Sequence, residues 1–148
     1  MKIKLNSIFV ENQDKALAFY TNVLGFKKSK EIRMGEFKWL TVVSPDGYPD
    51  VELVLEPNAN PIAKTFQEAI FKQGIPVTAF EVDDIDTETK RLKKKGVQFT
   101  MNPSDAGPVK IAIFSDTCGN LIQIYQPKRA NHTRRPQRGV ACAGDVRS

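Results

Sequence analysis

Histidine and cysteine are scarce in this chain of 148 residues. It has one histidine, His132, and two cysteines, Cys118 and Cys142. Metal centres built on these residues, and disulfide frameworks, need several of them at regular spacing. We therefore expect the two thiols to stay unpaired and His132 not to act as a metal ligand.

Long apolar runs are also absent. No run approaches the about 20 residues that a membrane-spanning helix needs, so we expect no membrane partner. Residues 1–13 have the pattern of a strand and none of a signal peptide, and we expect a cytoplasmic protein. The sequence also lacks a glycine-rich phosphate loop, a nucleophile elbow and a Cys-x-x-Cys motif. The hydrophobic content of 41% and charged content of 26% indicate one ordinary globular domain.

The net charge of +5 is unevenly distributed. Residues 1–127 carry 16 basic and 16 acidic residues, whereas residues 128–148 carry six basic residues and one acidic residue. A basic tail says nothing about the charge of the folded surface, so nucleic acid is not the expected partner. We expect the tail to be disordered, either as an extension without function or as a contact for an acidic partner such as DNA.

The first half of the chain has the pattern of a strand, a helix and three further strands. Residues 3–10 end in alternating apolar positions, and Asn12 or Asp14 can cap a helix that Gly25 ends. Three strands are predicted after the helix because turn residues separate the segments 27–34, 37–44 and 51–56.

The second half repeats this order after a predicted linker helix over residues 61–73. A strand at 77–82 and a helix at 84–96 are followed by strands at 97–101, 109–115 and 121–126. Superposing the halves aligns Val10 with Val82, Asn12 with Asp84, and Gly25 with Gly96 to within one residue. The chain is therefore an internal duplication.

Two motifs make the duplication specific. Residues 10–26 (VENQDKALAFYTNVLGF) and 115–127 (SDTCGNLIQIYQP) resemble the opening and closing motifs of the vicinal-oxygen-chelate superfamily, the glyoxalase/bleomycin resistance protein/dioxygenase family. The resemblance implies an α+β fold in a single domain over residues 1–127. Two tandem βαβββ modules, 3–57 and 75–127, would form a curved mixed sheet around a concave cleft. Family members are usually homodimers, and the modules could pair within a chain or by exchange between chains.

The resemblance also locates the family's metal site. In metal-dependent members the first strand of each module supplies a histidine or glutamine and the last strand supplies a glutamate. The first-strand positions here are Leu5 and Val77, which cannot bind a metal. One alignment of the last strands places Gln123 opposite Glu52, and a second places it opposite Leu53. We therefore expect no cofactor and disfavour a divalent metal. The remaining weak candidate ligands are Glu52, Glu56 and Gln123.

Strand alternation predicts an apolar and aromatic cleft with a few polar groups, which is typical of a small-molecule site. Trp39 could stack on a flat or cationic ligand, or pack in the core. Glu52 and Glu56 share a face that lines the cleft or is exposed to solvent. The predicted ligand-binding residues are Leu5, Ser7, Phe9, Trp39, Thr41, Glu52, Val77, Glu81, Ile111, Gln123 and Tyr125.

The favoured function is a binding protein that sequesters an amphiphilic or aromatic small molecule without the usual metal. The alternative is a glyoxalase-type enzyme: a lactoylglutathione-lyase-like lyase, an isomerase or a dioxygenase. In that case Glu52 or Glu56, with Gln123, would hold an ion, or Glu81 would act as a general base. Glu52 and Glu81 are therefore the candidate catalytic residues.

Overall fold

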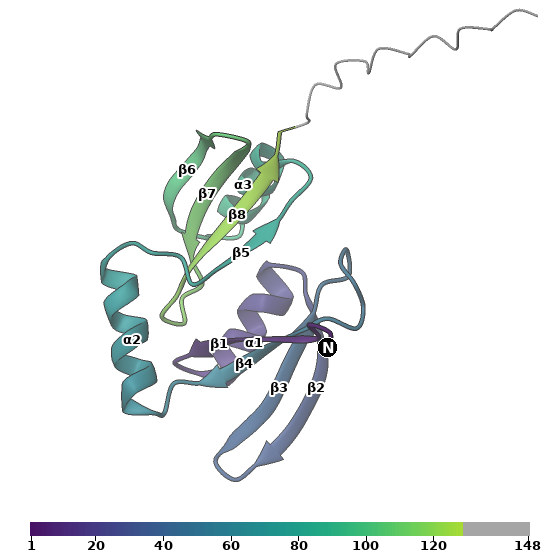
Figure 1. The fold of residues 1–148 in the computed structure, drawn as a ribbon, viewed down its shortest axis with the longest axis vertical. Coiled ribbons are helices and arrows are strands. Elements are labelled where there is room, and N and C mark those ends of the chain that lie inside the picture. The colour runs from purple at the N-terminus through teal and green to yellow at the C-terminus, as the bar shows by residue number, and fades with distance from the viewer. Residues whose placement is uncertain (129–148) are drawn as a thin grey trace, which may run out of the picture.

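The computed structural model describes residues 1–128 (Figure 1). The basic tail, His132 and Cys142 lie outside the described residues, apart from Lys128. The first module contains β1 (Leu5–Val10), α1 (Gln13–Ala18), η1 (Phe19–Val23), β2 (Lys27–Met34), β3 (Phe37–Val43) and β4 (Glu52–Pro57). After α2 (Pro61–Lys72), the second module contains β5 (Thr78–Glu81), α3 (Ile85–Lys94), β6 (Phe99–Ala106), β7 (Val109–Ser115) and β8 (Leu121–Pro127). In this part of the chain, no helix is long and apolar enough to cross a membrane.

Each module forms its own four-stranded mixed sheet. The strand order is β1-β4-β3-β2 in the first sheet and β5-β8-β7-β6 in the second. The edge strands β1 and β5 run parallel to β4 and β8, and the other neighbours are antiparallel. The predicted α+β fold with two βαβββ units is confirmed. The strands form two separate sheets rather than one hydrogen-bonded sheet.

The helices show how closely the two modules repeat. Asn12 and Asp84 cap α1 and α3, and each side chain accepts a hydrogen bond from the backbone N–H three residues on, at 2.9 and 3.0 Å. The caps are 72 positions apart in the sequence, whereas Gly25 and Gly96, which end the helical segments at φ of 86° and 84°, are 71 apart. The first helix accommodates its additional residue in the π-helix η1. The predicted helix that ends at Gly25 is therefore present, with its second part in the π-helical form.

The two modules share one hydrophobic core. Its buried residues come from the helix-facing sides of both sheets and from the helices of both modules. Phe19 of η1 packs against Phe114 of β7 with ring centroids 6.4 Å apart, and Phe26 packs edge-on against Phe80 of β5 at 5.2 Å. These contacts cross the module boundary, so neither module has a separate apolar interior.

A buried hydrogen-bond network around Asp116 also joins the modules. Asp116 follows β7 and is fully buried. Its Oδ2 accepts hydrogen bonds from Tyr20 Oη at 2.9 Å and from Asn120 Nδ2 at 2.8 Å. Its Oδ1 accepts from the backbone N–H groups of Cys118 at 2.8 Å and Asn120 at 3.0 Å. Burial, reinforced by the neighbouring carboxylate, raises the pKa of Tyr20 well above its ordinary value.

The same turn anchors the linker helix α2. Gln67 of α2 is 3% exposed, and its Nε2 donates to the backbone carbonyls of Phe9 at 2.8 Å and Cys118 at 3.2 Å. Gly119 has a φ of +97°, and a Cβ built there would lie 2.8 Å from Gln67 Nε2. Position 119 therefore needs glycine for two reasons, which explains the glycine of the closing motif.

We expect Tyr20→Phe to destabilise the protein, because it removes a donor from a buried carboxylate that both modules share. The expected loss is about 1–3 kcal/mol in the free energy of unfolding, measured by urea denaturation at neutral pH. Tyr48→Phe is the matched control because Tyr48 is 80% exposed, and it should leave the midpoint unchanged. Equal stability of the two variants would show that the network does not hold the modules together.

Candidate functional site

Each sheet has an outer face, formed by the strand residues that alternate with those packed in the core. Register places Leu5 beside Glu52, Ser7 beside Val54 and Thr41 beside Val54, so these side chains share one face. The predicted ligand-binding residues divide between the two outer faces. The first sheet carries Leu5, Ser7, Phe9, Trp39, Thr41 and Glu52; the second carries Glu81, Ile111, Gln123 and Tyr125, with Val77 just before β5.

The outer face of the first sheet is an open apolar surface. Leu5 is 47% exposed, Ile32 56%, Met34 63% and Phe37 41%. Trp39, partly buried, pairs with Ile32 across β2 and β3, and Met34 pairs with Phe37, whereas Leu5 lies on edge strand β1 beside Glu52. Neighbouring exposed apolar side chains of this kind are typical of a surface that binds a ligand or another chain. The structure thus places the predicted aromatic residue in a surface that the described residues leave uncovered.

Glu52 is the polar centre of this face and is only 9% exposed. Its Oε1 accepts hydrogen bonds from Ser29 Oγ at 2.5 Å and Thr41 Oγ1 at 3.1 Å, and its Oε2 accepts from Lys30 Nζ at 2.9 Å. The Ser29 hydroxyl, followed by the Lys30 ammonium, lowers the pKa of Glu52. Glu52 is therefore an ionised carboxylate whose two oxygens are already engaged.

Sequence reasoning missed Ser29 and Lys30. The register of β2 shifts between Lys28 and Lys30, so that both Ser29 and Lys30 reach Glu52. Regular alternation places neighbouring residues on opposite faces, and nothing in the local sequence signals this shift.

The structure corrects the predicted alignment of the last strands. Leu5 pairs with Glu52, and Val77, which lies 72 positions after Leu5, donates its backbone N–H to the carbonyl of Leu121 at 2.9 Å. The counterpart of Glu52 is therefore Leu121, and Gln123 lies two residues further along. Both predicted alignments, of Gln123 with Glu52 and of Gln123 with Leu53, are wrong. The hydrogen bonds to the edge strand define which positions are equivalent, and the sequence similarity of the two strands does not.

The donor set at these four positions does not fit a divalent ion. Leu5, Val77 and Leu121 have no donor atoms, and the carboxylate of Glu52 already accepts three hydrogen bonds. The other candidate ligands, Glu56 and Gln123, lie on different sheets. In the described residues 1–128, no group of three or more His, Cys, Asp or Glu side chains comes together.

On the outer face of the second sheet, two polar side chains form a hydrogen-bonded pair. Tyr125 Oη of β8 donates to Glu81 Oε2 of β5 at 3.0 Å, and this hydrogen bond raises the pKa of Tyr125. The equivalent pair on the first sheet is Phe9 with Glu56. Glu81, the predicted general base, therefore already accepts a hydrogen bond from a phenol at the edge of the sheet.

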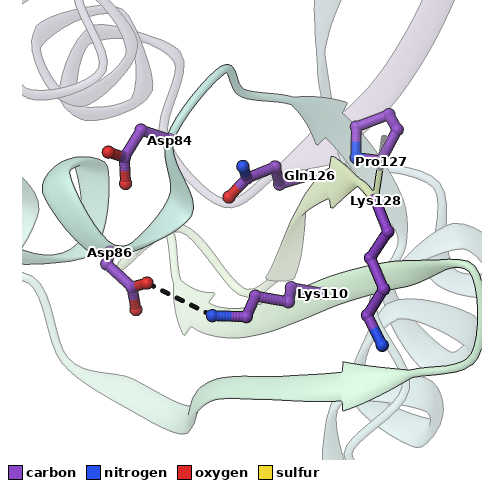
Figure 2. A pocket seen from close by; sticks show the side chains of 6 residues that line it. All are labelled: Asp84, Asp86, Lys110, Gln126, Pro127 and Lys128. Carbon is purple, nitrogen blue, oxygen red and sulfur yellow. Dashed lines mark hydrogen bonds and ion pairs between the residues drawn. The ribbon is translucent and has the colours of Figure 1, made fainter. Parts of the chain in front are cut away.

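A polar pocket of about 300 Å³ lies elsewhere, at the start of α3 (Figure 2). Gln126 Oε1 accepts the backbone N–H of Ile85 at 3.0 Å, and Lys110 pairs with Asp86 at 3.3 Å. The first contact satisfies a backbone N–H group at the start of the helix, and the second joins two side chains of the pocket. None of the predicted ligand-binding residues lines this pocket, which is formed by Asp84, Asp86, Lys110, Gln126, Pro127 and Lys128.

Comparisons with known proteins agree with this architecture. The family model of the Glyoxalase/Bleomycin resistance protein/Dioxygenase superfamily matches residues 2–124. The uncharacterized protein YurT of Bacillus subtilis is 56% identical over 126 residues, which cover 85% of this chain and 99% of YurT. The crystal structure of UcmS2 superposes with a TM-score of 0.74 at 32% identity, covering 84% of this chain and 97% of UcmS2. TnmS3, an antibiotic binding protein from Streptomyces sp. CB03234, gives a TM-score of 0.67 at 26% identity, covering 86% and 97% of the two chains.

The Glu52 network generates a pH prediction. A lowered folded-state pKa contributes stability above the unfolded value of about 4.3, and this contribution is lost as the pH falls through the folded value. Ser29→Ala removes the largest cause of the lowering, so the pKa of Glu52 should rise and the loss should begin at higher pH. Carbon NMR of the side-chain carboxyl, assigned with Glu52→Gln, measures the pKa.

Ser104→Ala is the matched control, because Ser104 is exposed and lies on the other sheet. It should leave the pKa of Glu52 unchanged. An unchanged value in Ser29→Ala would contradict the assignment of Ser29 as the main stabilising donor.

Proposed function

This chain belongs to the Glyoxalase/Bleomycin resistance protein/Dioxygenase superfamily, and we propose that it binds an aromatic or amphiphilic small molecule on the outer faces of its sheets without a metal. The observation that carries the proposal is the open apolar surface around Trp39. In addition, three of the four positions equivalent to the family's metal ligands, Leu5, Val77 and Leu121, are aliphatic. Such a surface can stack and enclose an apolar molecule.

Two relationships support binding over catalysis. TnmS3, which shares this fold at 26% identity, is described as an antibiotic binding protein. In this chain, the candidate catalytic groups Glu52 and Glu81 are engaged by Ser29, Thr41, Lys30 and Tyr125. A carboxylate that accepts several hydrogen bonds from fixed donors, as Glu52 does, is a poor general base, because these bonds stabilise its ionised form. Glu81 accepts one such bond, from Tyr125.

The proposed binding unit is a homodimer in which a second copy covers the outer faces. Leu5, Ile32, Met34 and Phe37 expose between 41% and 63% of their surface in a single chain. Burying neighbouring apolar side chains is the main driving force for association of identical subunits. The ligand would lie between the outer face of one copy and a face of the other, so the site is complete in the dimer alone.

Ligand binding should be visible through Trp39, the one tryptophan of the chain. We expect the fluorescence of Trp39 to be quenched by phenylnaphthylamine, a neutral aromatic dye, with saturation in the micromolar range. The dissociation constant should be the same in EDTA and in a molar excess of zinc, because the site uses no metal.

His132→Gln serves as the control for zinc binding in the tail. Absence of any saturable quenching would contradict the proposed function. Binding that appears in zinc and disappears in EDTA, in the wild type and in His132→Gln, would contradict metal independence.

The dimer makes a separate prediction. Sedimentation velocity should show a homodimer, and Met34→Glu should shift it to monomer, because a buried unpaired carboxylate is costly in an apolar interface. Ile62→Glu is the matched control, since Ile62 is 79% exposed on α2, which belongs to neither sheet. A wild-type monomer, or a dimer that Met34→Glu leaves intact, would contradict this arrangement.

A further inference from the structure

We propose that Lys30 is the charged anchor of the ligand site, and that the ligand is an aromatic molecule with an acidic oxygen such as a carboxylate, sulfonate or ionised phenol. The inference rests on the proposed function and deepens it, because it assigns the ligand's chemical class and a residue that contacts it. It starts from the geometry of the ion pair between Lys30 and Glu52.

The ion pair presents its positive end to the surface. The side chain of Glu52 is 11% exposed, whereas that of Lys30 is 54% exposed. The hydroxyl groups of Ser29 and Thr41 donate hydrogen bonds to the buried carboxylate and stabilise its charge. The Lys30 ammonium uses one of its three donors on Glu52 Oε2 at 2.9 Å. Its remaining donors are available on the outer face.

Glu52 therefore acts as a positioning residue for Lys30. A free lysine side chain loses much of its rotamer freedom when a ligand fixes it. An ammonium already held by a buried carboxylate loses less when a ligand binds, which favours a geometrically defined contact. The four-residue network thus fixes one ammonium on the same face as the apolar side chains of Ile32 and Trp39.

Lys30 also lies beside the aromatic part of the surface. It pairs with Thr41, and Ile32, two residues along β2, pairs with Trp39. An aromatic ligand stacked on Trp39 would therefore place a substituent at its edge within the region of the ammonium. Charge-assisted hydrogen bonds to an anionic oxygen are stronger than neutral ones and favour such a substituent.

The equivalent position in the second module has the opposite character. There Met101 occupies the place of Lys30, because Met101 pairs with Ile113 as Lys30 pairs with Thr41. Leu121 occupies the place of Glu52. The two outer faces thus differ at equivalent positions. The first has a fixed ammonium, and the second has an aliphatic side chain and a thioether. A ligand with one acidic edge and one apolar face fits this asymmetry.

The test compares two dyes with the same ring system. Anilinonaphthalene sulfonate carries an anionic sulfonate, and phenylnaphthylamine lacks it. We expect the wild type to bind the sulfonate dye more tightly, and Lys30→Met to weaken that binding about tenfold. Binding of phenylnaphthylamine should change little, and Lys30→Arg, which keeps the cation, should retain the preference. Fluorescence titration of the three proteins with each dye measures all six dissociation constants.

Three further variants test whether Lys30 itself, rather than a neighbouring charge, holds the anionic group. Lys28→Met removes the same charge from a lysine that pairs with Glu31 and lies opposite Val42 on the other face, and should have no effect. The double variant Lys30→Met with Glu52→Gln removes both charges and should stay weak. Recovery in the double variant would show that exposed negative charge, rather than loss of the anchor, caused the change. A loss in Lys27→Met but not in Lys30→Met would assign the anchor to Lys27.

The outcomes also separate this inference from the proposed function. If neither dye binds, the proposed function fails, and this inference fails with it. If phenylnaphthylamine binds but the sulfonate brings no gain in affinity, or if Lys30→Met weakens both dyes equally, the protein binds aromatic molecules and the role of Lys30 is wrong.

Discussion

The buried carboxylate of Asp116 is the constraint on which the arrangement of the two modules depends. It accepts four hydrogen bonds, and one of them comes from Tyr20 in the other module. A buried charge is tolerated only where such donors surround it, so the two modules must dock with Tyr20 in place. The turn that carries Asp116 also receives Gln67 from α2. One turn therefore fixes the second module, the first module and the linker together.

Much of this architecture could be predicted from the residues. The repeated cap positions, Asn12 and Asp84, identified two equivalent units, and alternation in β1 assigned Leu5 and Phe9 to the face opposite the core. Such features follow from local periodicity, which sequence reports directly. The hydrogen-bonded placement of Asp116 did not follow, since Tyr20 lies 96 positions away in the sequence.

The features that escaped prediction are local irregularities in a helix and in a strand. The π-helix η1 accommodates an extra residue in the first helix, and the shift in β2 brings both Ser29 and Lys30 to Glu52. In both cases the irregularity satisfies tertiary contacts, and composition carries no trace of it. The candidate site is affected most, because two of the three donors to Glu52 come from the irregular strand β2. The duplicated modules consequently share a frame while differing in the chemistry of their outer faces.

The parallel edge strands impose an order on folding. β1 pairs with β4 across 47 positions of sequence, and β5 pairs with β8 across 44, whereas the hairpins between them close over a few residues. Closing long loops delays contact formation relative to local hairpins. Each edge strand is therefore seated after its sheet has begun to form. Because Leu5, Ser7 and Phe9 lie on β1, the outer face of the first sheet is among the last parts of the molecule to be assembled, and a nascent chain has no complete outer face until its first module has closed.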